Sequence, residues 1–159
     1  MQLHLFTKRL AFEEARKEDA PLLVSLYNAA FYEDYLKYGE CPAYGRTVEQ
    51  MEKSIQTYKK QIIRYHHIPV GVISAEQKAD GEYEIGCLCI IPKYQGHGLG
   101  TQALQYLRNL HKDWRKITLI TPTDKEQNIR FYTEKNSFHI DGVEKDGNVH
   151  VARLVMVKQ

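Results

Sequence analysis

One segment, residues 85–112, constrains the fold of this 159-residue chain more than any other. Its apolar run from Ile85 to Ile91, Gly86 included, predicts a buried strand, and Pro92 ends it because proline cannot donate to a strand ladder. A glycine-rich turn from Gln95 to Gly100 comes next. After the turn, apolar residues recur at helical spacing and predict a helix to about residue 112: Leu99, Ala103, Leu104, Leu107 and Leu110.

The glycine turn has the chemistry of a phosphate site. The first turn of a helix leaves backbone N–H groups without partners, and glycines let the backbone approach a phosphate closely. A Walker loop would need a lysine directly before Thr101, and the sequence has none there. A dinucleotide-binding turn needs its third glycine one place after Gly100. A turn that only joins strand to helix is the structural alternative.

The remaining patterns predict the order strand, two helices, three strands, helix, strand, helix and two strands. This order indicates one α/β (α+β) domain over residues 1–159, with a mixed, mostly antiparallel sheet of about six to seven strands and about four helices. The predicted strands are 11–16, 61–65, 70–76, 83–91, 116–121, 138–144 and 149–157. The predicted helices follow an Asp19 cap, a Thr47–Gln50 capping box, the glycine turn and a Thr123–Glu126 capping box.

The composition of the chain argues against several classes of protein. The formal net charge of +2 gives no basic patch for a nucleic acid, and the sequence has no apolar run long enough to cross a membrane. Three cysteines without paired spacing fit a reducing compartment, and the histidines show no zinc spacing. We therefore expect a cytoplasmic protein without a metal, a nucleic-acid partner or a membrane partner, and a homodimer is left open.

The turn matches the Gln/Arg-x-x-Gly-x-Gly/Ala loop at every specified position. The stretch from Ile90 to Gly100 resembles the strand, turn and helix of the GNAT superfamily of acyl-CoA-dependent N-acyltransferases, and the order of elements is similar from Ala11 onward. The resemblance implies a GNAT fold with a splayed sheet and acetyl-CoA as cosubstrate. It implies that the turn binds the pyrophosphate through Gln95, Gly96, His97, Gly98, Leu99, Gly100 and Thr101, and that the strand before it binds the acyl-pantetheine through Leu88, Cys89 and Ile90.

The resemblance also implies roles for residues elsewhere. Tyr132 corresponds to the family's general-acid tyrosine, which hydrogen-bonds the leaving thiolate, and Glu84 opens the strand where relatives often carry a base. Asn128 shares a helix face with Tyr132 and could reach the cofactor. Two departures are clear: Lys125 stands where the family often has asparagine, and Ser137 replaces its glycine. Each assignment has a structural alternative, aromatic packing for Tyr132 and a solvated carboxylate for Glu84.

The residues from Phe31 to Tyr44 are predicted to form a tyrosine-rich loop, and the resemblance implies that its first part, from Phe31 to Tyr35, overhangs the amine side of the cleft. Its candidates for substrate binding are Phe31, Tyr32 and Tyr35, because aromatic faces suit a cation, although they could equally form a lid that packs on the sheet. The expected function is transfer of an acetyl group to the primary amine of a small molecule by direct attack in a ternary complex. The alternatives are a peptide or protein N-acetyltransferase, a non-catalytic CoA-binding sensor module and a nucleotide-binding domain.

Overall fold

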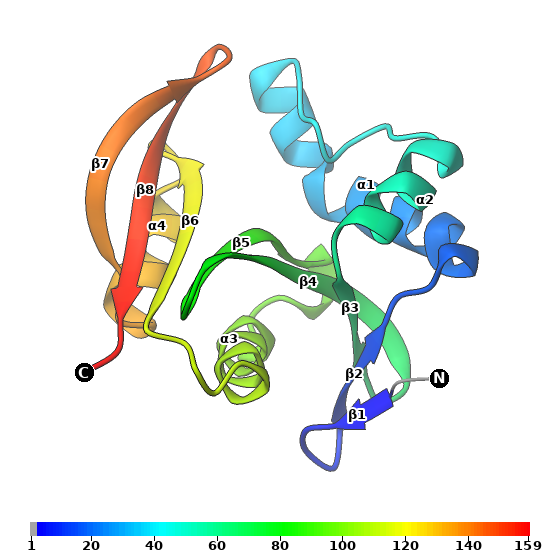
Figure 1. The fold of residues 1–159 in the computed structure, drawn as a ribbon. Helices are drawn as coiled ribbons and strands as arrows, with labels where there is room; N and C mark the ends of the chain where they lie inside the picture. Colours follow the sequence, from blue (N-terminus) through cyan, green and yellow to red (C-terminus); the bar gives the residue numbers. More distant parts are fainter. Residues whose placement is uncertain (1–2) are drawn as a thin grey trace. The chain divides into compact units, whose positions relative to one another are not determined.

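The computed structural model describes residues 3–159, with side chains from Leu5 onward (Figure 1). The described chain forms a mixed sheet of eight strands in the order β1-β2-β3-β4-β5-β6-β8-β7. The strands are β1 (Leu3–Leu5), β2 (Leu10–Glu14), β3 (Lys60–Tyr65), β4 (Ile68–Ala79), β5 (Glu82–Ile90), β6 (Lys116–Pro122), β7 (His139–Asp146) and β8 (Val149–Val157). The α-helices are α1 (Ala20–Tyr38), α2 (Val48–Thr57), α3 (Leu99–Leu110) and α4 (Glu126–Lys135).

The chain divides into two compact units. Unit 1 comprises the chain up to Ala75 together with Gly86–Tyr106, and unit 2 comprises Glu76–Ile85 together with Leu107–Gln159. Strands β4 and β5 and helix α3 each contribute residues to both units. The predicted cofactor turn therefore belongs to unit 1, whereas α4 belongs to unit 2.

The core of unit 1 has one layer under α1 and α2. Buried side chains of the two helices pack on apolar residues of β3, β4 and β5: Leu23, Leu26, Tyr27, Met51 and Ile55 against Ile62, Val72 and Cys89. Helix α2 begins at the predicted capping box, since Gln50 N donates to Thr47 Oγ1 at 3.1 Å and Thr47 N donates to Gln50 Oε1 at 2.9 Å. That local prediction is confirmed.

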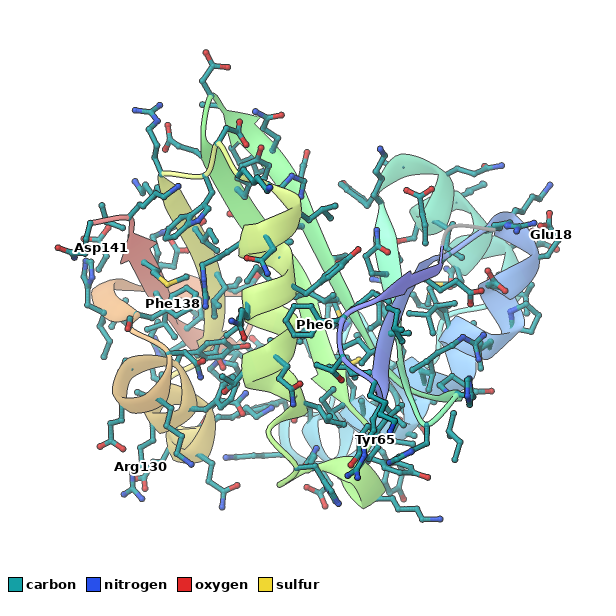
Figure 2. The ribbon with its side chains drawn as sticks, turned by 90° about the horizontal axis from the view of Figure 1, so that it is seen from below. Phe6, Glu18, Tyr65, Arg130, Phe138 and Asp141 are labelled. Atoms are coloured by element: carbon teal, nitrogen blue, oxygen red, sulfur yellow. The ribbon has the colours of Figure 1, made fainter. Side chains whose placement is uncertain are left out.

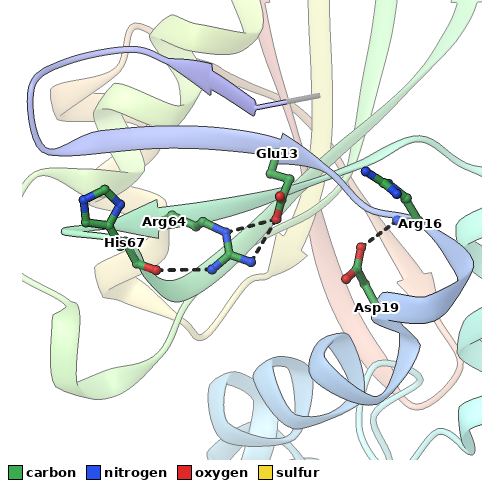
Figure 3. A network of polar contacts seen from close by, with 5 residues as sticks. All are labelled: Glu13, Arg16, Asp19, Arg64 and His67. Carbon is green, nitrogen blue, oxygen red and sulfur yellow. Dashed lines mark hydrogen bonds and ion pairs between the residues drawn. The ribbon is translucent and has the colours of Figure 1, made fainter. Parts of the chain in front are cut away.

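Aromatic rings form the second core layer of unit 1. Phe12 of β2 stacks on Tyr106 of α3 with ring centroids 3.9 Å apart, and Phe6 meets both rings edge-on (Figure 2). Between β2 and β3, Arg64 donates two hydrogen bonds to Glu13 Oε1 at 2.9 and 3.0 Å (Figure 3). Because Glu13 is buried, this charge-assisted pair holds the two strands in register.

Unit 2 is built on β6. The start of β5 pairs in parallel with β6 (Glu82 opposite Lys116), and β8 pairs with β6 in antiparallel fashion along its whole length. Strand β7 is the edge strand, fully exposed, and its register with β8 shifts between Ile140 and Val143. Parallel and antiparallel pairs therefore coexist, and the predicted mixed, mostly antiparallel sheet is confirmed.

Three sequence predictions need correction. Phe31, Tyr32 and Tyr35 lie on α1 and not in a loop, because no glycine or proline interrupts the helix before Gly39, whose left-handed φ of 74° ends it. Helix α4 has no capping box from Thr123 and Glu126, because its N-cap residue is Lys125, whose side chain does not cap the helix. The short strand β1 was not predicted at all. No helix among the described residues is long and apolar enough to cross a membrane.

Candidate functional site

The glycine turn connects β5 to α3 through two left-handed residues. A short 3₁₀ turn (Pro92–Tyr94) follows β5, and Gly96 and Gly98 then adopt φ values of 82° and 76°. Both glycines are solvent-exposed. L-residues rarely adopt this conformation, so the two glycines are needed for the path of the chain into α3.

Hydrogen bonds fix the turn in front of α3. The Gln95 side-chain amide donates to the carbonyl of Ile90 at 2.9 Å. The first hydrogen bond of the helix runs from Gln102 N to Gly98 O at 3.2 Å, so the N–H groups of Leu99, Gly100 and Thr101 lie ahead of it. The first turn of α3 carries no acidic residue. These N–H groups and the helix dipole therefore favour an anion.

The strand residues before the turn are tightly packed against β4. A Cβ atom at Gly71 of β4 would collide with the carbonyl oxygen of Cys89, so only glycine permits this approach. Cys89 is buried, whereas Leu88 and Ile90 are partly exposed. Because Gln95 already occupies the Ile90 carbonyl, the backbone of residues 88–90 is held in place from both sides.

Tyr132 and Asn128 lie one turn apart on α4. Tyr132 is 7% exposed and contacts Phe131 and Phe138 edge-on, with ring centroids 5.0 and 5.3 Å away (Phe138 is labelled in Figure 2). Asn128 donates to Thr121 Oγ1 of β6 at 3.3 Å. Ser137 has a left-handed φ of 64°, in the region that favours glycine.

Glu84 lies on β5 beside a lysine of β4. Lys78 Nζ is 3.8 Å from Glu84 Oε1 and 3.1 Å from Glu76 Oε2, and the Glu84 side chain is 38% exposed. The carboxylate is thus accessible to water and paired loosely with a cation, an arrangement compatible with either a base or a surface charge.

The aromatic residues of α1 form a small exposed cluster with Tyr44. Tyr35 stacks on Tyr44 at 4.6 Å, and Tyr32 meets Tyr44 at 5.9 Å. Tyr32 and Tyr35 are 48% and 41% exposed. Asn28 accepts a hydrogen bond from Gly45 N at 2.9 Å, which ties the segment after α1 to that helix. Phe31 points differently and contacts Tyr27 at 5.9 Å.

Comparison with known proteins decides the family. The sequence model of the Acetyltransferase (GNAT) family matches residues 21–138. The chain belongs to the GNAT acetyltransferase family. It is thus an acetyl-CoA-dependent acetyltransferase. The family and the fold predicted from the sequence are confirmed.

Solved structures agree with the fold of this GNAT protein. An acetyltransferase from Thermus thermophilus is 20% identical with a TM-score of 0.77, and the match covers 94% of this chain and 97% of that one. An acetyl transferase from Salmonella typhimurium that modifies the N-terminal serine of ribosomal protein L7/L12 is 17% identical with a TM-score of 0.79, covering 99% and 100%. The microcin C7 self-immunity acetyltransferase MccE, solved with acetyl-CoA and AMP, is 16% identical with a TM-score of 0.77, covering 96% and 94%. The search of curated proteins found no match.

The two units divide the predicted site residues of the GNAT protein. Unit 1 holds the residues predicted for the cofactor from Leu88 to Thr101 and the aromatic residues of α1. Unit 2 holds Glu84, Asn128 and Tyr132. Within unit 1 the strand and the turn are directly connected through the Gln95–Ile90 hydrogen bond.

A polar cluster under α1 was not predicted from the sequence. Lys60 Nζ donates to the Tyr27 hydroxyl at 2.9 Å, and the Arg46 guanidinium lies over the same ring at 5.4 Å. Cys89 belongs to the same buried cluster as Tyr27, and the partly buried Cys87 packs against that cluster. Cys87 and Cys89 are two residues apart on a strand and therefore share one face, and this spacing was the only sequence pattern that pointed to the cluster.

Proposed function

We propose that the protein transfers the acetyl group of acetyl-CoA to the primary amine of a small molecule by direct attack in a ternary complex. The observation that carries the proposal is the glycine turn, where two left-handed glycines precede the N-terminus of a helix with no acidic residue in its first turn. This geometry accepts a bulky anion at close range.

The CoA pyrophosphate would contact the turn from Gln95 to Thr101. The exposed Gly96, His97 and Gly98 leave the backbone accessible, and the first N–H groups of α3 supply donors. The backbone of Leu88, Cys89 and Ile90 would hold the pantetheine arm and the acyl carbonyl, with Gln95 positioning Ile90. Asn128 would contact the pantetheine from α4.

The reaction needs a free amine and a stabilised leaving group. An alkylammonium with a pKa of about 10.4 requires roughly 4–5 kcal/mol to deprotonate at neutral pH, so a base is useful. We assign this role to Glu84, whose exposed carboxylate can act directly or through water. We assign Tyr132 as the donor of a hydrogen bond to the departing CoA thiolate, because its buried position limits competition from water.

The acceptor site is proposed at the aromatic residues of α1. The exposed faces of Tyr32 and Tyr35 suit the cationic form of an amine before it loses its proton, and Phe31 is included as a neighbour on the same helix. A compact aromatic patch of this kind favours a small molecule. A polypeptide acceptor is the second candidate. It is supported by the Salmonella enzyme that modifies the N-terminal serine of a ribosomal protein, because the structure of that enzyme matches nearly the whole chain.

Residues 1–159 are proposed to act as one catalytic domain. Support comes from the full-length structural matches, each of which covers 94% or more of this chain. A non-catalytic CoA-binding module would share the same fold, so activity is the property to measure.

Thiol release from acetyl-CoA across a panel of amines tests the proposal. The panel contains polyamines, aminoglycosides, amino acids and a peptide with a free N-terminal serine. We expect saturable thiol release with at least one small amine and a mass increase of one acetyl group on it. Release with the peptide alone would replace the small-molecule acceptor by a polypeptide. Binding of acetyl-CoA without release with any amine would favour the non-catalytic module.

A further inference from the structure

Lys60 of β3 is a buried cation that lacks a carboxylate partner. It is 5% exposed, and its ammonium group donates a hydrogen bond to the Tyr27 hydroxyl at 2.9 Å. Among the side chains described from Leu5 onward, no carboxylate lies within ion-pair distance of Lys60 or of the nearby Arg46. A buried ammonium is costly unless an anion compensates it, and burial lowers the pKa of Lys60 accordingly. The fold therefore keeps this lysine at a cost to its stability.

Arg46, which directly precedes the N-cap of α2, is a second cation at the same ring. Its Cζ atom lies 5.4 Å from the centroid of the Tyr27 ring, and the Lys60 Nζ atom lies 5.3 Å from it. Arg46 is held in place because its Nε donates to the Pro42 carbonyl at 2.9 Å and its Nη1 donates to Ser54 Oγ at 3.2 Å. Both partners are neutral, so two cationic side chains meet at one ring without a carboxylate to balance them.

The Tyr27 phenol does not supply the negative charge. It is 1% exposed, and burial raises the pKa of Tyr27, so its hydroxyl stays protonated. The donors that remain fit a small anion. The Lys60 ammonium has three N–H donors and uses one of them on Tyr27, and Arg46 Nη2 donates to no group among the described residues. A carboxylate has two oxygens, so it can accept from the ammonium and from the guanidinium together.

This pair of cations adjoins the aromatic residues that are proposed to bind the acceptor amine. Tyr27 contacts Phe31 edge-on, with ring centroids 5.9 Å apart. Tyr44, which stacks on Tyr35, precedes Arg46 by two residues, a stretch of chain that spans at most about 7 Å. An acceptor of modest size can therefore contact the aromatic residues with one end and Arg46 with the other.

We propose that Arg46 and Lys60 bind a carboxylate of the acceptor, so that the substrate is an amino acid or a similar amino-carboxylate. Arg46 is partly exposed and Lys60 is buried, so the carboxylate approaches from the side of Arg46. This inference rests on the proposed function, because the amine end of the acceptor is placed there at the aromatic residues of α1. It makes polyamines and aminoglycosides poor acceptors, since they carry no carboxylate.

The first test compares acceptors that differ only in negative charge. Thiol release from acetyl-CoA is measured with glycine, β-alanine and lysine and with the amide of each. We expect kcat/KM to be at least tenfold higher for the best acid than for its amide, mainly through KM. Arg46→Gln and Lys60→Met should each bring this ratio close to one. A ratio of one in the unchanged protein, or a ratio that survives both substitutions, overturns the proposal. Faster turnover of phosphoethanolamine than of every amino acid would overturn the carboxylate as the anion.

The second test measures carboxylate binding without turnover. A ligand that binds only the native state raises the midpoint of thermal unfolding. We expect acetate to raise this midpoint by about 2–4 °C more than acetamide does, with ionic strength held constant by sodium chloride. Lys60→Met should lose the difference between the two compounds. An equal effect of acetate and acetamide on the unchanged protein would contradict a carboxylate site.

Matched variants separate this site from general charge effects. Lys59→Met and Arg9→Gln each remove one exposed cation of unit 1, and both should keep the ratio of acid to amide and the effect of acetate. Arg46→Gln, at a partly exposed residue, keeps both tests valid if Lys60→Met does not fold.

The two tests also distinguish this inference from the proposed function. If acids and amides are acetylated equally well and acetate has no specific effect, the inference fails while the proposed function stands. If acetate stabilises the protein through Lys60 but no amine releases thiol, the carboxylate site stands and the proposed transfer fails. If neither thiol release nor an acetate effect is found, both fail.

Discussion

At the scale of single residues, the backbone at Ser137 is strained, and this is the position where the sequence departs from the glycine of the family pattern. Ser137 adopts a φ of 64° directly after α4, in the left-handed region that favours glycine. The neighbouring Asn136 side chain donates to Phe131 O at 2.8 Å and closes the helix end, and Phe138 N donates to Tyr132 O at 3.0 Å. The surrounding hydrogen bonds therefore hold Ser137 in a conformation that its Cβ disfavours.

Replacing Ser137 by glycine should stabilise the protein. We expect Ser137→Gly to raise the free energy of unfolding by about 1 kcal/mol, because the strain of the left-handed serine is removed. Urea denaturation followed by circular dichroism measures it. Ser137→Ala is the matched control, since it removes the hydroxyl but keeps the Cβ, and it should give no gain. Equal gains from both variants would contradict the strain argument.

Tyr132 is the residue for which packing and catalysis are separable. Tyr132→Phe keeps the ring contacts with Phe131 and Phe138 but removes the hydroxyl. We expect kcat to fall about 10²-fold with the Kd for acetyl-CoA nearly unchanged, because the lost hydrogen bond acts on the leaving thiolate. Steady-state kinetics and calorimetry measure the two effects. Tyr58→Phe, at an exposed tyrosine, serves as control. Full activity in Tyr132→Phe would leave only a packing role.

At the scale of elements, the turn before α3 is both a constrained piece of backbone and the proposed binding site for the CoA pyrophosphate. Gly98 and Gly45 have nearly the same left-handed φ, 76° and 77°, and neither would place a Cβ in a close contact. They differ in position, because Gly98 precedes the N-terminus of α3 and Gly45 lies before α2. Their comparison therefore isolates the role of the turn.

Gly98→Ala should weaken acetyl-CoA binding about tenfold or more. An alanine there either strains the left-handed backbone, at about 1–2 kcal/mol, or shifts the N–H groups of α3 away from the pyrophosphate. Gly45→Ala should lose similar stability and keep the same Kd. Calorimetry with acetyl-CoA and thermal unfolding of both variants give the comparison. Equal losses of affinity would show that the turn has no specific part in binding.

Most of the sequence predictions that rest on neighbouring residues are confirmed, with the Thr123–Glu126 capping box as the exception. The Thr47–Gln50 capping box and the strand, proline, glycine turn and helix around Gly98 depend on neighbours in the chain, and the structure confirms both. The continuation of α1 through Tyr35 was missed because tyrosine has only a weak local preference. The bond from Lys60 to Tyr27 spans 33 residues, so no local pattern could reveal this contact.

At the scale of the whole molecule, buried tyrosines make stability depend on alkaline pH. Tyr83 donates to Asp113 Oδ1 at 2.8 Å and stacks on His111 at 4.2 Å. Burial, followed by this hydrogen bond, raises the pKa of Tyr83 to about 12. The unfolded chain releases this proton near pH 10, so the stabilisation is present below pH 10 and is lost as the pH rises from 10 through 12.

Tyr83→Phe should therefore cost stability that depends on pH. We expect a deficit of about 1–2 kcal/mol at pH 8 relative to the unchanged protein, from the lost hydrogen bond to a carboxylate. The deficit should shrink by pH 11, where the unfolded state already favours ionised tyrosine. Urea unfolding at both pH values measures it, with Tyr58→Phe as control. A deficit that is the same at both pH values would contradict this origin.

The edge strand β7 has a consequence for how the protein behaves at high concentration. Exposed strand edges offer unpaired backbone groups to other chains and promote aggregation. In β7 the register shift after Ile140, with Gly142 at a φ of 130°, bends the strand out of a regular ladder. Charged side chains also line it: Asp141, Glu144, Lys145 and Asp146. A second copy therefore cannot easily pair with β7, and this edge of the sheet resists polymerisation as the protein concentration rises.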